Sequence, residues 1–284
     1  FMKLRNAIKQ SCDTYFYEIA RKLGVDRLSI TASKFGLGDE VLNGIFPNEK
    51  KGLVPNTKWK KDTLGVGWVL GETLIIGIGQ GYIQTTPLQL CLMMAQLANG
   101  GFKIYPKIIV DENQDTLENI QYKMALNVNK EANILPGIRA VEELFNIKNE
   151  KYTRLFRNPE NVKFVLEAMF ASTNELYGTS YSSRIEDPKY QFAGKTGTAQ
   201  VKRITEEARE LDLKTSQIPY EERDHALYIA YGPYKNPRYA VSIIVEHGGS
   251  GSSIAAPMAK KLFKFIIDRH ELREQTRKQN LATT

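Results

Sequence analysis

The chain has 284 residues, of which 42% are apolar and 25% charged, so one domain or two small ones with a sizeable core can form. Its net charge of +7 would suit nucleic acid, anionic lipid or an acidic polymer. Lys and Arg are scattered among Asp and Glu, however, and no nucleic-acid-binding motif accompanies them, so we expect no nucleic-acid role. No apolar run approaches the ~20 residues that span a bilayer, and no signal peptide heads the chain. Because the sequence starts at Phe1, we expect that a further segment precedes it.

Apolar residues recur at helical spacing over residues 3–23, and Gly24 follows as a C-cap. The polar "SCDT" in the middle of this stretch predicts a break into two helices. Asp13 or Thr14 would then cap the second helix.

The next part of the chain changes character. Residues 26–35 predict another short helix. The glycines, prolines and lysines of residues 36–71 then indicate a long irregular segment.

The stretch "GIGQGYIQTTPLQL" contains the clearest helix start in the sequence. Thr86 is the expected cap, Pro87 occupies the first helical position, and residues 88–97 continue the helix up to Asn99 and two glycines. The glycines before it could cradle a phosphate, but the G-x-x-x-x-G-K pattern is missing, so we favour a turn.

The middle of the chain gives weaker signals. Residues 103–110 predict a strand, residues 111–151 are polar and favour no element, and residues 161–171 predict a helix. Residues 202–224 are charged and indicate an exposed hairpin excursion or a loop helix.

Towards the C-terminus, "HALYIAYGP" and "RYAVSIIVEHGG" predict two strands joined by a short turn. The glycines that follow, Gly248, Gly249 and Gly251, indicate a turn into a helix over residues 254–269, and residues 271–284 form a charged tail that we expect to be frayed. This order predicts an α+β fold, with a helix lying across an antiparallel sheet.

The two cysteines are too few for a disulfide framework and say little about compartment. Cys12 could ligate zinc, but no further ligand is identified near it, so we favour a small buried core residue. Cys91 lies in an apolar helix and is also expected in the core. His225 and His247 fall at strand ends, where we expect structural roles or a place beside a cleft.

The stretch "QFAGKTGTAQV" predicts a strand with polar residues and glycine in its middle. Glycine in a strand interior usually marks a bulge or the close approach of a backbone or ligand. The ammonium of Lys195 can attract a carboxylate, Thr196 and Thr198 can donate hydroxyl hydrogen bonds, and Gly197 leaves room for a substrate. An extended peptide could also pair with the edge of this strand.

Six motifs in a fixed order carry a specific resemblance. They are "SCDTYFYEIA", "GIGQGY", "TTPLQL", "AGKTGTAQ", "DHALYIAYGP" and "VEHGGSGSSIAAPMAKKL". Together they resemble the transpeptidase domain of class B penicillin-binding proteins of the penicillin-binding protein 2 type, over about residues 1–268. The implied fold is the serine β-lactamase/transpeptidase-like one, an antiparallel sheet with helices on both faces. In domain terms, residues 1–175 would be the helical portion and residues 190–269 the sheet and C-terminal helix.

The resemblance implies a role for each matching residue. Ser11 would relay a proton to or from the leaving nitrogen, and Asp13 would bind substrate or orient nearby lysines, although both could simply cap a helix. Lys195 would help proton transfer and, with Thr196 and Gly197, recognise the substrate carboxylate. The backbone N–H of Thr198 would supply half of an oxyanion hole.

One motif of the family is missing. The Ser-x-x-Lys that carries the nucleophile occurs nowhere in the 284 residues. We therefore expect the nucleophile, two sheet strands and the central helix to lie upstream, and the core to be incomplete with exposed apolar faces.

The resemblance implies a peptidoglycan D,D-transpeptidase that binds stem peptides and β-lactams and needs no metal or organic cofactor. It also implies a periplasmic domain of an inner-membrane-anchored protein, with an elongation glycosyltransferase as partner. A D,D-carboxypeptidase or a β-lactamase stays open as an alternative. So does a non-catalytic fragment or peptide-binding module.

Overall fold

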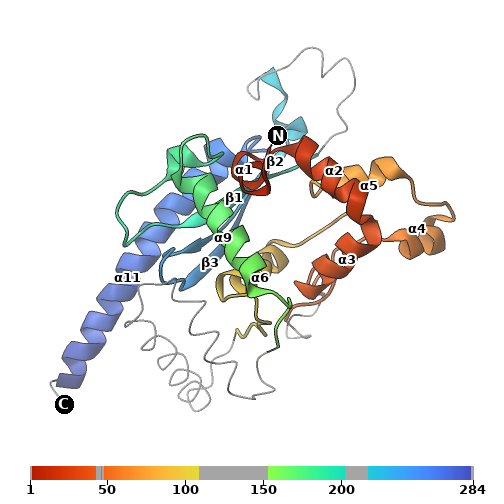
Figure 1. Cartoon of the computed structure of the whole chain (residues 1–284). Helices are drawn as coiled ribbons and strands as arrows, with labels where there is room; N and C mark the ends of the chain where they lie inside the picture. Colours follow the sequence, from red (N-terminus) through yellow and green to blue (C-terminus); the bar gives the residue numbers. More distant parts are fainter. Residues whose placement is uncertain (1, 43–45, 47, 109–152, 202–216, 283–284) are drawn as a thin grey trace. The chain divides into compact units, whose positions relative to one another are not determined.

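The computed structural model describes residues 2–42, 46, 48–108, 153–201 and 217–282 (Figure 1). The chain divides into two compact units, Phe1–Met169 and Phe170–Thr284. The described part of the first unit is built of helices, and the second unit holds a sheet and a long C-terminal helix. Within these described residues, no helix combines the length and the apolar character needed to cross a membrane.

The first two helices of unit 1 are separated at "SCDT", as predicted. Helix α1 (Leu4–Gln10) ends at Ser11, which adopts a left-handed backbone conformation with φ of 51°, and α2 (Asp13–Leu23) follows directly. The predicted capping of α2 by Asp13 or Thr14 is wrong, because α2 starts one residue earlier and Cys12 occupies the N-cap position. The predicted C-cap at Gly24 is confirmed, and α3 (Val25–Lys34) follows it.

The predicted irregular segment over residues 36–71 is wrong in its second half. Helix α4 (Thr57–Leu64) lies inside it, and α5 (Leu70–Ile76) begins there. Asn56 starts α4 by accepting a hydrogen bond from the Trp59 backbone N–H at 2.8 Å, and Gly65 ends it in a left-handed conformation. At the start of α5 the side chain lies inside the helix instead: the Glu72 carboxylate accepts a hydrogen bond from the Val69 backbone N–H, at the N-cap position, at 3.0 Å.

The two short helices are tied together by a partly buried ion pair. The Lys60 ammonium contacts the Glu72 carboxylate at 2.5 Å and donates to the Gly67 carbonyl at 2.9 Å. The side chains of Lys60 and Glu72 are only 6% and 18% exposed. This part of the sequence is rich in lysine and glycine, so its helicity comes from the tertiary contact and the caps, not from an apolar period.

The helix start at Thr86 is confirmed in detail. Helix α6 (Pro87–Ala98) has a capping box, in which Thr86 accepts the Gln89 N–H at 3.2 Å and Gln89 accepts the Thr86 N–H at 2.9 Å. The preceding glycines form turns, since Gly79 and Gly81 have φ of 79° and 80°. The turn interpretation of this loop is therefore supported.

The predicted strand at residues 103–110 is wrong where the structure describes it. Residues 103–108 form no strand, and the neighbouring Phe102 makes one isolated bridge with Arg154. The segment packs beside α6 instead, where the Gln96 side-chain oxygen accepts the Ile104 N–H at 3.1 Å. The end of the predicted strand, residues 109–110, and the polar residues 111–151 lie outside the described residues.

The predicted helix over residues 161–171 is confirmed as α9 (Pro159–Asn174). Of the charged excursion predicted over residues 202–224, residues 202–216 lie outside the described residues. The described remainder includes the 3₁₀ turn η3 (Tyr220–Glu222).

Unit 2 contains the three predicted strands as one antiparallel sheet in the order β1-β2-β3. Strand β1 (Ala193–Ala199) pairs with β2 (His225–Gly232), which pairs with β3 (Tyr239–Val245). The α+β class expected from the sequence is confirmed.

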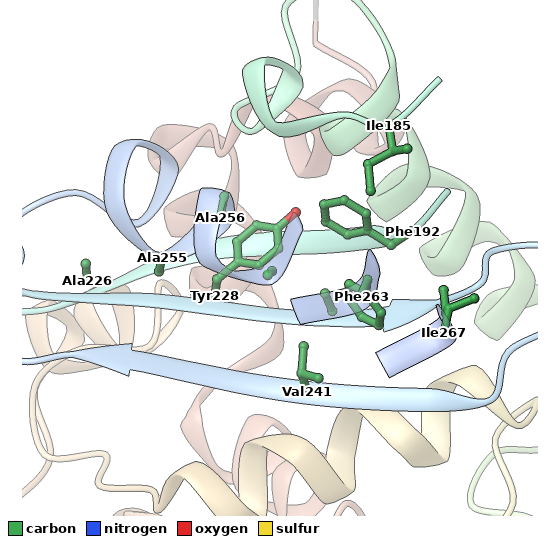
Figure 2. Close-up of a cluster of buried hydrophobic side chains, with 11 residues drawn as sticks. Ile185, Phe192, Ala226, Tyr228, Val241, Ala255, Ala256, Phe263 and Ile267 are labelled. Atoms are coloured by element: carbon green, nitrogen blue, oxygen red, sulfur yellow. The ribbon is translucent and has the colours of Figure 1, made fainter. Parts of the chain in front are cut away.

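One face of this sheet carries the core of unit 2. Figure 2 shows the rings of Phe192, Tyr228 and Phe263 meeting there, with Val241 of β3 and Ile267 of the last helix beside them. Phe192 stacks on Phe263 with centroids 5.1 Å apart and meets Tyr228 edge-on at 6.3 Å. These fully buried aromatic contacts hold the helix against β2.

The expected glycine turn and C-terminal helix are both present. A π-helical turn, η4 (Gly251–Ala255), leads into α11 (Ala256–Ala282). The expected fraying of residues 271–284 is wrong for residues 271–282, because α11 continues to Ala282. Polar contacts, which the spacing of apolar residues does not reveal, stabilise these last turns: Glu274 binds both Arg238 at 3.2 Å and His270 at 2.9 Å.

Replacing Lys60 by Met should destabilise the protein by about 3 kcal/mol, because the partly buried Glu72 carboxylate would lose its partner. Burial raises the pKa of Glu72, but the hydrogen bonds from Lys60 and Val69 outweigh it and hold the pKa below the ordinary 4.5. The ion pair therefore stabilises the fold at pH values above 4.5, and this stabilisation is lost as the pH falls through the lowered pKa of Glu72. Urea denaturation at several pH values measures this.

The matched control is Lys58→Met, which breaks a solvent-exposed pair with Asp62 and should leave the free energy of unfolding nearly unchanged. If both variants lost the same free energy of unfolding at neutral pH, the Lys60–Glu72 pair would contribute no more than the exposed pair.

Candidate active site

The Lys-Thr-Gly-Thr segment lies in the middle of β1, at the edge of the sheet. Within the described residues only β2 pairs with β1. Lys195 is opposite Ile229 and Thr196 is opposite Tyr228, so their side chains leave the strand on opposite faces. Thr196 shares the face of the core, and Lys195 lies on the other face.

The Lys195 ammonium nevertheless turns back towards Thr196. Its Nζ donates to the Thr196 carbonyl at 3.0 Å and to the Thr196 Oγ1 at 3.4 Å. An ammonium and a hydroxyl this close together can donate to the two oxygens of one carboxylate. The arrangement therefore offers a short, positively charged donor pair at a sheet edge.

Gly197 is approached by another glycine of the chain. A Cβ on Gly251 would lie 2.5 Å from the Leu227 carbonyl oxygen and 2.7 Å from the Gly197 carbonyl oxygen. The turn η4 thus packs backbone against backbone on β1 and β2, which only glycine permits here. A Cβ on Gly197 itself would make an ordinary 3.4 Å contact with Leu227, so the role of Gly197 in admitting a substrate stays a prediction.

A cluster of hydroxyl groups lies behind the strand, and sequence reasoning did not predict it. The Thr196 hydroxyl donates to the Thr179 hydroxyl at 3.3 Å, which in turn lies 3.0 Å from the Ser172 hydroxyl. The only sequence signal was the Ser/Thr-rich stretch "STNELYGTSYSS" after the apolar part of α9.

A second group of hydroxyls surrounds Tyr228. Its phenol oxygen lies 2.9 Å from the Thr173 hydroxyl and 3.0 Å from the Ser180 hydroxyl, and Thr173 accepts the Gly194 N–H at 3.1 Å. Burial raises the pKa of Tyr228 to about 12, so the phenol stays neutral and able to donate. A Cβ on Gly194 would lie 2.5 Å from the same phenol, so Gly194 is required for this close approach.

The two histidines at the strand ends contact each other. The His247 N–H donates to His225 Nδ1 at 2.9 Å, and His247 Nδ1 lies 3.1 Å from the Arg223 carbonyl oxygen. One ring nitrogen of each histidine thus forms a hydrogen bond with a backbone group, which fits the structural role expected for them.

Ser11 and Asp13 belong to unit 1, at the junction of α1 and α2. Ser11 ends α1 and Asp13 opens α2, so the "SCD" motif is the turn itself. Lys195, Thr196, Gly197 and Thr198 belong to unit 2, and the meeting of the two groups in one active site stays a prediction.

Cys12 is half-buried at this turn, so the expectation of a buried core cysteine is wrong, and Cys91 is likewise only half-buried. Hydrogen bonds from the Thr14 hydroxyl and the Tyr15 backbone lower the pKa of the Cys12 thiol. Among the residues with described positions, no three His, Cys, Asp or Glu side chains are grouped to hold a metal ion.

The sequence pattern of the family described as "Penicillin binding protein transpeptidase domain" matches residues 1–264. The chain belongs to this family. The transpeptidase domain is 32% identical over 268 residues to the peptidoglycan D,D-transpeptidase MrdA of Salmonella typhimurium, covering 94% of this chain and 38% of that protein. The MrdA of Haemophilus influenzae is 32% identical over 267 residues, covering 93% and 36%.

Solved structures agree with this assignment. Penicillin-binding protein 2 of Pseudomonas aeruginosa, in complex with WCK 5153, superposes with a TM-score of 0.65 at 33% identity, over 93% of this chain and 48% of that one. The complex between penicillin-binding protein 2 and MreC from Helicobacter pylori gives a TM-score of 0.68 at 27% identity, over 93% and 40%. The transpeptidase domain thus spans less than half the length of these relatives.

Gly251→Ala should destabilise the transpeptidase domain by about 1–3 kcal/mol, because the new methyl group would meet two backbone carbonyls that cannot move independently. The control Gly71→Ala has nothing within 4 Å of the new Cβ and lies in α5, so it should be neutral or stabilising by up to about 1 kcal/mol. Urea denaturation of both variants measures the difference. A Gly251→Ala protein as stable as the parent would show that η4 does not press on β1 as described.

Proposed function

We propose that this chain is the substrate-recognition part of a peptidoglycan D,D-transpeptidase. The observation that carries the proposal is the Lys195–Thr196 donor pair at the edge of β1, inside a domain of the transpeptidase family. A D-Ala-D-Ala stem peptide ends in a carboxylate and can extend along a strand edge, so it matches both properties of this surface.

Each residue of the Lys-Thr-Gly-Thr segment of β1 then has a role. Lys195 and Thr196 bind the terminal carboxylate of the donor peptide by charge-assisted hydrogen bonds. Gly197 leaves room for the peptide beside the strand, and the Thr198 N–H donates to the oxygen that becomes negatively charged during acyl transfer.

The chemistry takes place in two acyl-transfer steps. A serine oxygen bonds to the carbonyl carbon between the two D-Ala residues, the C–N bond breaks, and the departing nitrogen receives the serine proton through Ser11 and Lys195. An amine of a neighbouring stem peptide then attacks the ester carbonyl carbon, the C–O bond to the serine breaks as the cross-link forms, and a proton of the attacking amine passes to the serine oxygen. Asp13 binds substrate or orients the lysines in both steps.

The nucleophile comes from residues outside this sequence. The 284 residues contain no Ser-x-x-Lys, the motif that supplies the serine and its activating lysine in this superfamily. The chain by itself should therefore hold a substrate without being acylated, and acylation is a property of the full-length protein.

Two of the solved relatives support a proposal for the setting of the full-length protein. The Helicobacter pylori relative is solved with MreC, and another neighbour comes from a peptidoglycan synthase complex that coordinates polymerization and crosslinking. We place the present domain in the periplasm, attached to an inner-membrane anchor outside these residues, with a glycosyl-polymerising elongation enzyme as partner.

Fluorescent penicillin tests this function. The full-length protein should form a stable covalent adduct, visible by gel fluorescence and by intact mass, while the 284-residue chain alone should stay unlabelled. Lys195→Ala should slow acylation of the full-length protein by on the order of 100-fold. Lys235→Ala, an exposed residue on the loop between β2 and β3, is the control and should have no effect.

The lifetime of the adduct separates the possible activities. A durable adduct supports the transpeptidase, while rapid hydrolysis would indicate a β-lactamase. Stoichiometric labelling of the chain alone would show that its own residues contain the nucleophile and would refute that part of the proposal.

Ser11→Gly separates a catalytic role for Ser11 from a purely structural one. Ser11 has φ of 51°, so glycine should relieve backbone strain and leave the free energy of unfolding unchanged or higher. Loss of a proton relay should slow acylation of the full-length protein about 100-fold or more. Stopped-flow acylation and urea denaturation measure the two effects.

Asn48→Gly is the matched control, because Asn48 has a similar φ of 68° and is exposed. It should change neither property by much. A Ser11→Gly protein that is acylated at the parent rate would mean that Ser11 only ends α1.

A further inference from the structure

The hydroxyl groups of Thr196, Thr179 and Ser172 form a continuous chain in unit 2. Thr196 Oγ1 donates to Thr179 Oγ1 at 3.3 Å, and Thr179 Oγ1 lies 3.0 Å from Ser172 Oγ. Ser172 is fully buried, whereas Thr179 and Thr196 are half-buried. This chain of hydroxyl groups thus runs from the edge strand β1 into the interior of unit 2, behind the carboxylate-binding pair Lys195 and Thr196.

The position of Thr179 is held by the turn that carries it. The Ser180 N–H and hydroxyl both donate to the Ser172 carbonyl, at 3.0 and 3.2 Å. A Cβ on Gly178 would lie 2.3 Å from the same carbonyl oxygen, so the turn packs tightly on the end of α9. Thr179 is therefore fixed beside β1 by its backbone, independently of its own hydroxyl.

Counting donors shows what the hydroxyl chain must do when a carboxylate binds. A hydroxyl has one hydrogen and can accept from others. In the structure Thr196 gives its hydrogen to Thr179 and accepts from the Lys195 ammonium at 3.4 Å. A bound carboxylate accepts only, so Thr196 must turn its hydrogen outward to reach it.

We propose that Thr179 is a positioning residue for carboxylate recognition, acting through a reversible hydroxyl chain. When the carboxylate binds, Thr196 donates to it, Thr179 donates to Thr196, and Ser172 donates to Thr179. Hydroxyl hydrogens rotate and no proton is transferred, so Thr196 keeps its side-chain position in both states. This inference rests on the proposed function, since it concerns the same carboxylate.

A threonine or serine at position 179 can donate or accept as the two states require, whereas valine of nearly the same shape can do neither. In the bound state valine would remove the hydrogen bond from Thr179 to the Thr196 oxygen and leave it only the longer contact with the Lys195 ammonium, at 3.4 Å. A net hydrogen bond between neutral groups corresponds to about a fivefold change in an equilibrium or rate constant.

The test compares two probes on the full-length protein: benzylpenicillin, which carries the free carboxylate, and its methyl ester, which does not. Thr179→Val should lower the second-order acylation constant for the acid by about fivefold and leave that for the ester unchanged. Thr179→Ser should restore the parent value for the acid. Thr31→Val, an exposed threonine on α3, should change neither constant.

The outcomes separate this inference from the function on which it rests. If the parent protein is acylated, but Thr179→Val slows both probes equally or neither, the positioning role is wrong and Thr179 is only structural or irrelevant. If the parent is acylated by neither probe, the proposed function fails and this inference fails with it. A loss confined to the acid, with rescue by serine, supports the hydroxyl chain.

Discussion

The antiparallel pairing of β1 with β2 is the interaction on which the second unit depends. The register puts Thr196 opposite Tyr228 and Lys195 opposite Ile229, which assigns each side chain to a face. A shift by one residue would move Thr196 away from the hydroxyl cluster and bring Lys195 into the apolar core. The burial of Tyr228 against Phe192 and α11 makes such a shift costly, because the aromatic contacts exist in one register only.

The polar layer between β1 and α9 follows from the same pairing. Tyr228 reaches across Gly194, and its phenol would be an unsatisfied buried group without Thr173 and Ser180. The Thr173 hydroxyl in turn accepts the Gly194 N–H. Recognition at the strand edge is therefore built on a buried, hydrogen-bonded layer that orders the strand before any substrate arrives.

Glycine has a different physical role at each of three positions near this strand. Gly194 lets the Tyr228 ring approach, Gly251 lets one backbone pack on another, and Gly178 lets the Thr179 turn close on α9. In each case a methyl group would meet atoms that are held by other contacts. The close approach of a neighbouring ring or backbone, more than flexibility, explains these residues.

Several elements could be predicted because their causes are local. Two strand-forming apolar runs separated by a short turn predicted β2 and β3, and the cap and proline at Thr86 and Pro87 predicted α6. Helix α4 and the last turns of α11 could not be predicted from the spacing of apolar residues. Ion pairs with residues distant in sequence stabilise them, Lys60 with Glu72 and Glu274 with Arg238. Likewise, the apolar residues after Phe102 resembled a strand but pack as an irregular segment.

By itself the sequence determined the chemical groups of the site and the family: the Lys-Thr-Gly strand, the "SCD" turn, and the absence of Ser-x-x-Lys from these 284 residues. Such motifs are contiguous, so residue type and order suffice to recognise them. Only the tertiary structure decided that Thr179 lies against Thr196, 17 residues further along the chain. Hydroxyl contacts between a turn and a strand follow no sequence period, because the packing of the turn on α9 and the strand register bring them together.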